Sequence, residues 1–195
     1  GTAIILPTLT KIGRSDIAYT LLLQHSNPSW LYSVDQGATT IWERWNSYTI
    51  ESGFGDVSMN SFNHYAYGAV ASWMFESLAG IGADPDNPGF KHILFAPQPD
   101  DRLSVKASYD SAYGVITAES SYDGDIWTYK CSLPANTTAE IRIPVSDAGD
   151  VVVNGKAASE LSLSCDGIEF AGIESGVAVF NAVSYSFTFS VNMAG

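Results

Sequence analysis

A single carboxylate, Glu43, lies among large aromatic side chains in the segment Gly37–Trp45. Trp42 and Trp45 flank it and Arg44 follows it, in a chain of which only 15% of residues are charged. Indole rings offer flat apolar faces with a polar edge, which suits the C–H face and hydroxyl rim of a sugar ring. A carboxylate beside them can exchange a proton with water. The residue types therefore indicate acid–base chemistry on a sugar-like ligand.

The same spacing has a purely structural interpretation. Thr40 followed three residues later by Glu43 fits a capping box, in which the two side chains bind exposed amides of a first helical turn. Trp42 and Trp45 are three residues apart, so on a helix they would share one face and pack as ordinary core. Local spacing leaves both interpretations open.

About twenty residues later, the segment Asn60–Tyr65 adds a second group of polar and aromatic side chains. His64 near a helix start is either a hydrogen-bonded structural residue or a ligand contact. Asn60 and Asn63 are equally compatible with helix caps and with sugar contacts. The loop between the two segments carries Gly53–Asp56, which is either a pocket wall or a connector anchored by its phenylalanine.

Two long segments, in this order and at this separation, resemble the C-terminal signature of the bacterial α-L-rhamnosidase family of glycoside hydrolases. They are Gly37–Trp45 and Met59–Val70. The upstream segments Gly13–Asp16 and Pro28–Tyr32 fit the same pattern. The resemblance covers most of residues 4–110 and, more loosely, the remainder of the chain.

The resemblance implies a six-hairpin α/α barrel followed by a C-terminal β-sandwich, and inverting hydrolysis that releases terminal α-L-rhamnose from rhamnosides. The family's general base is the Glu of a Thr-x-Trp-Glu-x-Trp pattern, which carries over to Glu43. A His on the following helix touches the bound rhamnose in the family, and it carries over to His64. Trp42 and Trp45 either line the sugar pocket or support Glu43 from behind. Arg44 either orients the carboxylate or lies on the outer surface.

The family's general acid lies well upstream, in a stretch that this sequence does not contain. We therefore expect the chain to carry only the base half of the site and to be inactive without the missing N-terminal part of the barrel. The chain begins inside an apolar run at Gly1, which suggests a piece of a longer polypeptide. Neither a P-loop nor a Rossmann glycine motif occurs in the sequence, and we expect no cofactor and no metal.

The elements that must position these residues fall into two expected domains. Residues 1–82 are predicted to be helical, as the terminal helices of an incomplete barrel. The longest helix is predicted over residues 62–80, and it is apolar on nearly all sides, so it must be covered by neighbouring elements. Composition changes near Gly82, where a Pro/Asp/Gly-rich stretch cannot continue a helix.

Residues 83–195 are predicted to form an antiparallel β-sandwich, which makes the whole chain α+β. Short β-type runs are separated by turn signals, and Asp123–Gly124 and Asn154–Gly155 favour tight hairpins because these residues tolerate positive φ. Cys131 and Cys165 both lie in β-like stretches and form either a disulfide or two small buried apolar groups.

Composition excludes several function classes. A formal charge of −12 and a pI near 4.3 oppose binding to nucleic acid. No run approaches the length of a membrane span, and no group of Cys and His has the spacing of zinc ligands. The sequence does not assign a compartment.

Two other functions remain open at this point. A non-catalytic module would bind carbohydrate or protein through the sandwich and use the helices only for docking. Its candidate contacts are the aromatic residues of the predicted strands, Tyr109, Tyr113, Tyr122, Trp127 and Tyr129. Another inverting α/α-barrel hydrolase, specific for a different sugar, would also use Glu43.

Overall fold

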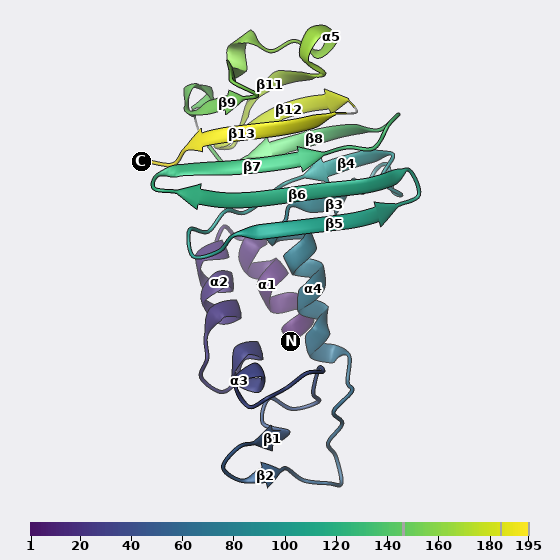
Figure 1. Cartoon of the computed structure of the whole chain (residues 1–195), viewed down its shortest axis with the longest axis vertical. Coiled ribbons are helices and arrows are strands. Elements are labelled where there is room, and N and C mark those ends of the chain that lie inside the picture. The colour runs from purple at the N-terminus through teal and green to yellow at the C-terminus, as the bar shows by residue number, and fades with distance from the viewer. Residues whose placement is uncertain (146, 184, 195) are drawn as a thin grey trace. The chain divides into compact units, whose positions relative to one another are not determined.

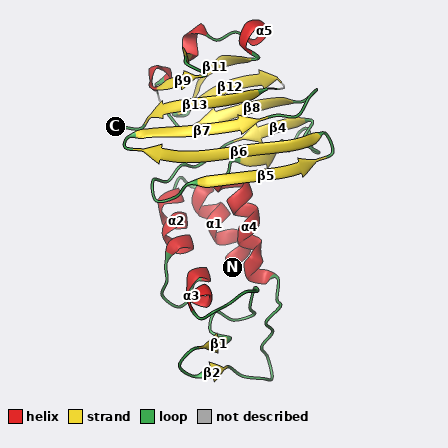
Figure 2. Ribbon diagram, in the orientation of Figure 1, coloured by secondary structure: helices red, strands yellow, loops and turns green. Residues whose placement is uncertain are grey.

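Most helical residues lie in the first part of the chain and most strands in the second. Figure 2 colours the helices red and the strands yellow. The structure is a computed structural model that describes residues 1–145, 147–183 and 185–194. Its contacts divide the chain into two units, Gly1–Trp73 and Met74–Gly195. The boundary expected after residue 82 falls within the second unit, because Ile81–Ala83 pairs with the strand His92–Phe95. The segment rich in Pro, Asp and Gly is thus the connection between these two strands.

The first unit is built on short helices. They are α1 (Thr2–Lys11), α2 (Ser15–Leu23), α3 (Trp30–Asp35), the 3-10 helix η1 (Ala66–Ala69) and α4 (Val70–Trp73). α1 packs against both α2 and α4 (Figure 1). Trp73 is buried where they meet, with its indole N–H donating to the Thr10 hydroxyl at 2.8 Å and its ring edge-on to Tyr19.

The segment between α3 and η1 is largely without regular structure. Among the described residues of this segment, the only paired strands are β1 (Tyr48–Thr49) and β2 (Gly53–Phe54). Glu43 lies in a bend where no helix begins, and the Thr40 and Glu43 side chains bond to Phe62 and Ser61, so the capping-box interpretation is wrong.

The helix predicted over residues 62–80 begins later than expected. Residues 61–65 are irregular, and η1, α4 and the π-helix η2 (Met74–Leu78) follow. The reason is competition for backbone groups. The Ser61 carbonyl accepts from the Glu43 amide at 2.8 Å, and the Phe62 carbonyl accepts from the Thr40 hydroxyl. In a helix that begins at residue 62, these carbonyls would instead accept from the amides of residues 65 and 66.

The second unit is a sandwich of two sheets, drawn as two layers of arrows in Figure 1. The six-stranded sheet has the order β10-β9-β13-β7-β6-β5, and the five-stranded sheet has the order β11-β12-β8-β4-β3. The strands are β3 (Ile81–Ala83), β4 (His92–Phe95), β5 (Val105–Ser111), β6 (Gly114–Asp123), β7 (Ile126–Ser132), β8 (Thr138–Ile143), β9 (Val151–Val153), β10 (Lys156–Ala157), β11 (Ile168–Glu174), β12 (Val177–Val183) and β13 (Ser186–Asn192). Short helices η3 (Ala148–Asp150), η4 (Ala158–Glu160) and α5 (Leu163–Asp166) lie in the connections.

Both predicted hairpins are confirmed. β6 and β7 pair on either side of Gly124, and β9 and β10 pair on either side of Asn154–Gly155, whose φ angles are +51° and +84°. Two consecutive positive φ angles are what a two-residue hairpin turn needs to match the strand twist. The sheets are antiparallel as expected, except that β4 and β8 pair in parallel.

The sandwich core is aromatic. Trp127 and Tyr129 on β7 are fully buried and their rings stack, with centroids 5.5 Å apart. They are therefore packing residues, whereas Tyr109 and Tyr113 remain partly exposed. Both cysteines are free thiols: Cys131 is buried on β7, but Cys165 is exposed on α5, which corrects its expected place in a strand.

Candidate active site

Two segments separated by about twenty residues are joined beside Glu43 by four hydrogen bonds, which we call the clamp. Two run between backbone groups, from the Glu43 amide to the Ser61 carbonyl and from the His64 amide to the Ile41 carbonyl. The third runs from the Ser61 amide to Oε2 of Glu43 at 2.8 Å. The fourth runs from the Thr40 hydroxyl to the carbonyl of Phe62. Residues 40–43 are thereby held against residues 61–64.

The Glu43 carboxylate is half-buried and is held through one of its two oxygens. In residues 1–145, 147–183 and 185–194 no hydrogen bond to Oε1 is found, and no ion pair includes this carboxylate. The group is thus oriented by Ser61 while Oε1 can still accept a proton.

His64 is oriented by its own segment. Its Nδ1 accepts from the Ala66 amide at 3.3 Å, and its ring stacks on Tyr65 with centroids 5.6 Å apart. Because Nδ1 accepts, the neutral ring carries its proton on Nε2, which makes that atom a donor for a ligand oxygen. The hydrogen-bonded structural role and a ligand-contacting role are therefore compatible in the same side chain.

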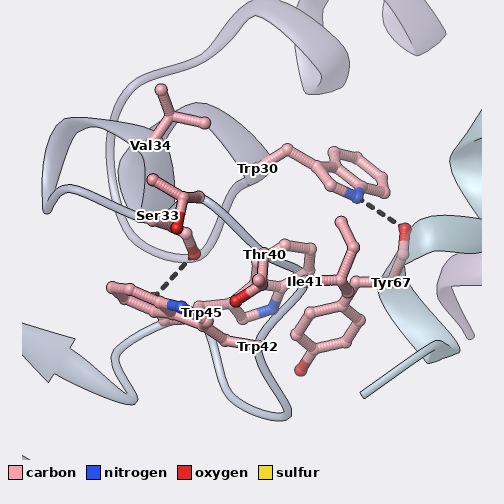
Figure 3. A pocket seen from close by; sticks show the side chains of 10 residues that line it. Trp30, Ser33, Val34, Thr40, Ile41, Trp42, Trp45 and Tyr67 are labelled. Atoms are coloured by element: carbon pink, nitrogen blue, oxygen red, sulfur yellow. Dashed lines mark hydrogen bonds between the residues drawn. The ribbon is translucent and has the colours of Figure 1, made fainter. Parts of the chain in front are cut away.

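An aromatic hollow of about 330 Å³ lies beside α3 (Figure 3). Its lining is mostly apolar and aromatic, with four side chains that carry a hydroxyl group, and consists of Trp30, Ser33, Val34, Ala38, Thr39, Thr40, Ile41, Trp42, Trp45 and Tyr67. Trp45 and Tyr67 stack with centroids 3.7 Å apart, and the Trp30 indole donates to the Tyr67 carbonyl at 2.9 Å (Figure 3). The Ser33 hydroxyl donates to the Trp45 carbonyl at 2.9 Å.

The predicted site residues fall into two groups. Trp42 and Trp45 line the aromatic hollow, whereas Glu43 and His64 are joined through the clamp and are not among its lining residues. Trp42 is also buried edge-on against Phe62 of the clamp, with centroids 5.4 Å apart. It therefore supports the Glu43 segment as well as lining the hollow.

Sequence reasoning missed Trp30 and Tyr67 as pocket residues. Both lie in segments that carry the family resemblance, but their contact spans 37 residues and leaves no local signal. Of the neighbouring polar residues, Asn60 donates to the carbonyl of Ser47, the residue just before β1, at 3.0 Å, so its side chain does not cap a helix start. Arg44 is exposed. The pKa of Asp56 is lowered by hydrogen bonds from Ser58 and, to a smaller degree, by the charge of this arginine.

Neither a cluster of metal ligands nor a membrane-spanning helix is found in the described part of the chain. No group of three or more His, Cys, Asp or Glu side chains there could hold a metal ion. None of its helices has both the length and the apolar character that a bilayer crossing requires.

Comparison with known proteins gives two matches along the chain. Residues 1–78 match the model of the bacterial α-L-rhamnosidase six-hairpin glycosidase domain, and residues 80–158 match that of the bacterial α-L-rhamnosidase C-terminal domain. A helical glycosidase domain followed by a β-rich C-terminal domain defines the class of protein. The expected α+β organisation is thereby confirmed.

Individual relatives agree with these matches. An α-L-rhamnosidase of Streptomyces avermitilis is 39% identical over 192 residues, which is 98% of this chain and 17% of that protein. One of Formosa agariphila is 41% identical over 157 residues, which is 80% of this chain and 17% of that protein.

Solved structures superpose closely. The Streptomyces avermitilis α-L-rhamnosidase complexed with L-rhamnose has a TM-score of 0.84 at 38% identity, over 98% of this chain and 17% of that one. The α-L-rhamnosidase of Dictyoglumus thermophilum has a TM-score of 0.80 at 27% identity, over 98% of this chain and 20% of that one. The chain belongs to the bacterial α-L-rhamnosidase family. It corresponds to the C-terminal part of its members and spans 17% of the length of the curated relatives described above.

Proposed function

We propose that this chain is part of an α-L-rhamnosidase that removes terminal α-L-rhamnose from rhamnosides by inverting hydrolysis. The observation that carries the proposal is the half-buried Glu43 carboxylate, which lies inside the segment matching the six-hairpin glycosidase domain and is oriented by a backbone amide. The relative of known structure complexed with L-rhamnose supports the choice of sugar.

In this proposal Glu43 is the general base. A water molecule attacks the anomeric carbon, its proton passes to the free oxygen of the carboxylate, and the bond to the aglycone oxygen breaks. A general acid on the opposite face protonates that leaving oxygen. Inversion requires the two carboxyl groups to stand about 6.5–9.5 Å apart, so that the water fits between base and sugar.

The protonated Nε2 of His64 is suited to bind a rhamnose hydroxyl, because sugar hydroxyls accept hydrogen bonds from such donors. Trp42 and Trp45 offer apolar indole faces in the aromatic hollow and complete the candidate substrate-binding set. No cofactor enters the reaction.

The general acid is supplied by the remainder of the barrel, so the 195-residue chain alone is inactive in this proposal. The first unit supports the need for such a partner, because it leaves large apolar side chains exposed. Ile4 of α1 is 67% exposed, and Val57 and Tyr65 are 93% and 88% exposed. Apolar groups of this size are ordinarily covered in a complete domain.

The test compares three proteins on an aryl α-L-rhamnoside: the longer protein that carries this chain, its Glu43→Gln variant, and the isolated chain. We expect turnover only in the first, with kcat of the variant lowered by about 100-fold or more because a general base contributes roughly that factor. Glu51→Gln is the matched control, since this carboxylate lies exposed in the β1–β2 turn. Proton NMR of the first sugar released gives the anomer. Retained configuration, or full activity of Glu43→Gln, contradicts the proposal.

A further inference from the structure

We propose that Thr40 is a positioning residue for the general base, acting through the clamp and not by contact with the sugar. This inference rests on the proposed function of Glu43. Its structural part, the dependence of the clamp on one hydroxyl group, can be tested independently of activity.

One hydrogen bond orients the Glu43 carboxylate. Oε2 of Glu43 accepts from the amide of Ser61 at 2.8 Å, so the direction of the carboxylate depends on where that peptide group stands. The Ser61 peptide is not fixed by a helix, because residues 61–65 are irregular. Its position is therefore set by whatever ties the segment to residues 40–43.

Four hydrogen bonds make that connection, and two of them join backbone to backbone. Of the two side chains in the clamp, one is the proposed base itself. The other is Thr40, whose hydroxyl donates to the Phe62 carbonyl, one residue after the amide that holds Glu43. Thr40 is thus the one clamp side chain that can be changed without altering the base.

The geometry also explains why a hydroxyl is required there. The Phe62 carbonyl needs a donor, and residue 62 cannot obtain one from a helix that begins only at Ala66. Valine has the shape of threonine without the donor, so Thr40→Val leaves this carbonyl to water and releases one end of the Ser61–Phe62 segment. Serine retains the donor in a smaller side chain.

In the longer protein we expect Thr40→Val to lower kcat by roughly 10-fold with KM unchanged, because small misplacements of a catalytic group reduce the rate without weakening substrate binding. Thr40→Ser restores kcat to near the wild-type value. Thr20→Val is the matched control, since the Thr20 hydroxyl makes a bond of the same kind, to the Asp16 carbonyl within α2.

Azide separates positioning of the base from a general structural role. Azide attacks the anomeric carbon without losing a proton, so it does not need the base. We expect the rate of glycosyl azide formation to be nearly the same in wild type and Thr40→Val. An equal loss with water and with azide, or a loss that Thr40→Ser does not repair, refutes the positioning role.

Hydrogen exchange tests the clamp in the 195-residue chain itself. We expect the Ser61 and His64 amides to exchange roughly 10-fold faster in Thr40→Val than in wild type or Thr20→Val, because both amides depend on the clamp. Unchanged exchange at these two amides overturns the inference. An inactive longer protein refutes the proposed function instead, whereas an active wild type with a fully active Thr40→Val refutes only the role of Thr40.

Discussion

Replacing Tyr129 by phenylalanine removes one oxygen atom from the centre of the sandwich. The Tyr129 hydroxyl donates to the carbonyl of Ala79 at 2.9 Å, and both residues are buried. Burial raises the pKa of Tyr129 well above its ordinary value, so the hydroxyl stays protonated and remains a donor. This hydrogen bond joins β7 to the connection between η2 and β3, in which Ala79 lies.

The expected cost follows from what the substitution leaves behind. The phenyl ring fills the space of the phenol ring, so no cavity forms, but the Ala79 carbonyl loses its partner in a site closed to water. A buried polar group left without a partner costs about 1–3 kcal/mol. We therefore expect the free energy of unfolding of the sandwich to fall by about 1–3 kcal/mol.

Native-state hydrogen exchange provides the assay, because the slowest amides of β7 and β13 report the global opening of the sandwich. Tyr185→Phe is the matched control, since this side chain is 64% exposed and its loss of a hydroxyl should cost almost nothing. If Tyr129→Phe destabilises the sandwich no more than the control does, water reaches the Ala79 carbonyl or the bond contributes nothing, and the reasoning fails.

Two further predictions concern the thiols and a glycine of the same unit. We expect iodoacetamide to modify Cys165 in the native protein at a lower pH than an ordinary thiol, because hydrogen bonds from two neighbouring serines lower the pKa of Cys165. Burial raises the pKa of Cys131, so this thiol stays protonated and unreactive until the protein unfolds. Mass spectrometry of the labelled peptides checks both statements, and labelling of Cys131 before unfolding contradicts them. Gly80→Ala should lower the free energy of unfolding by more than the about 1–2 kcal/mol expected for a left-handed residue, because a Cβ at Gly80 (φ +75°) would stand 2.5 Å from the backbone nitrogen of Pro97. Gly176→Ala is the control, since Gly176 has a similar φ of +80° but open space around its Cβ position. Equal melting temperatures for the two variants would refute the steric argument.

Local patterns predicted much of the sandwich. Alternating burial along β8 and β13 and the turn at Asn154–Gly155 depend on residues that are neighbours in sequence, and both are found. The parallel pairing of β4 with β8 was not predicted, because it depends on how distant strands are ordered in the sheet. Hydrophobic alternation places a side chain on a face, but it does not say which strand lies alongside.

The candidate site shows the same limit at closer range. From the sequence by itself, Glu43, Trp42, Trp45 and His64 are predicted as candidate site residues, because this prediction depends on residue type and on motifs within short segments. Only the tertiary structure decided what holds them. The helix expected from residue 62 is replaced by the clamp, since the carbonyls of Ser61 and Phe62 accept hydrogen bonds from a segment some twenty positions earlier instead of from amides four residues later. A hydrogen-bonding group has few partners, and which partner it takes depends on proximity in space, which periodicity along the chain does not record.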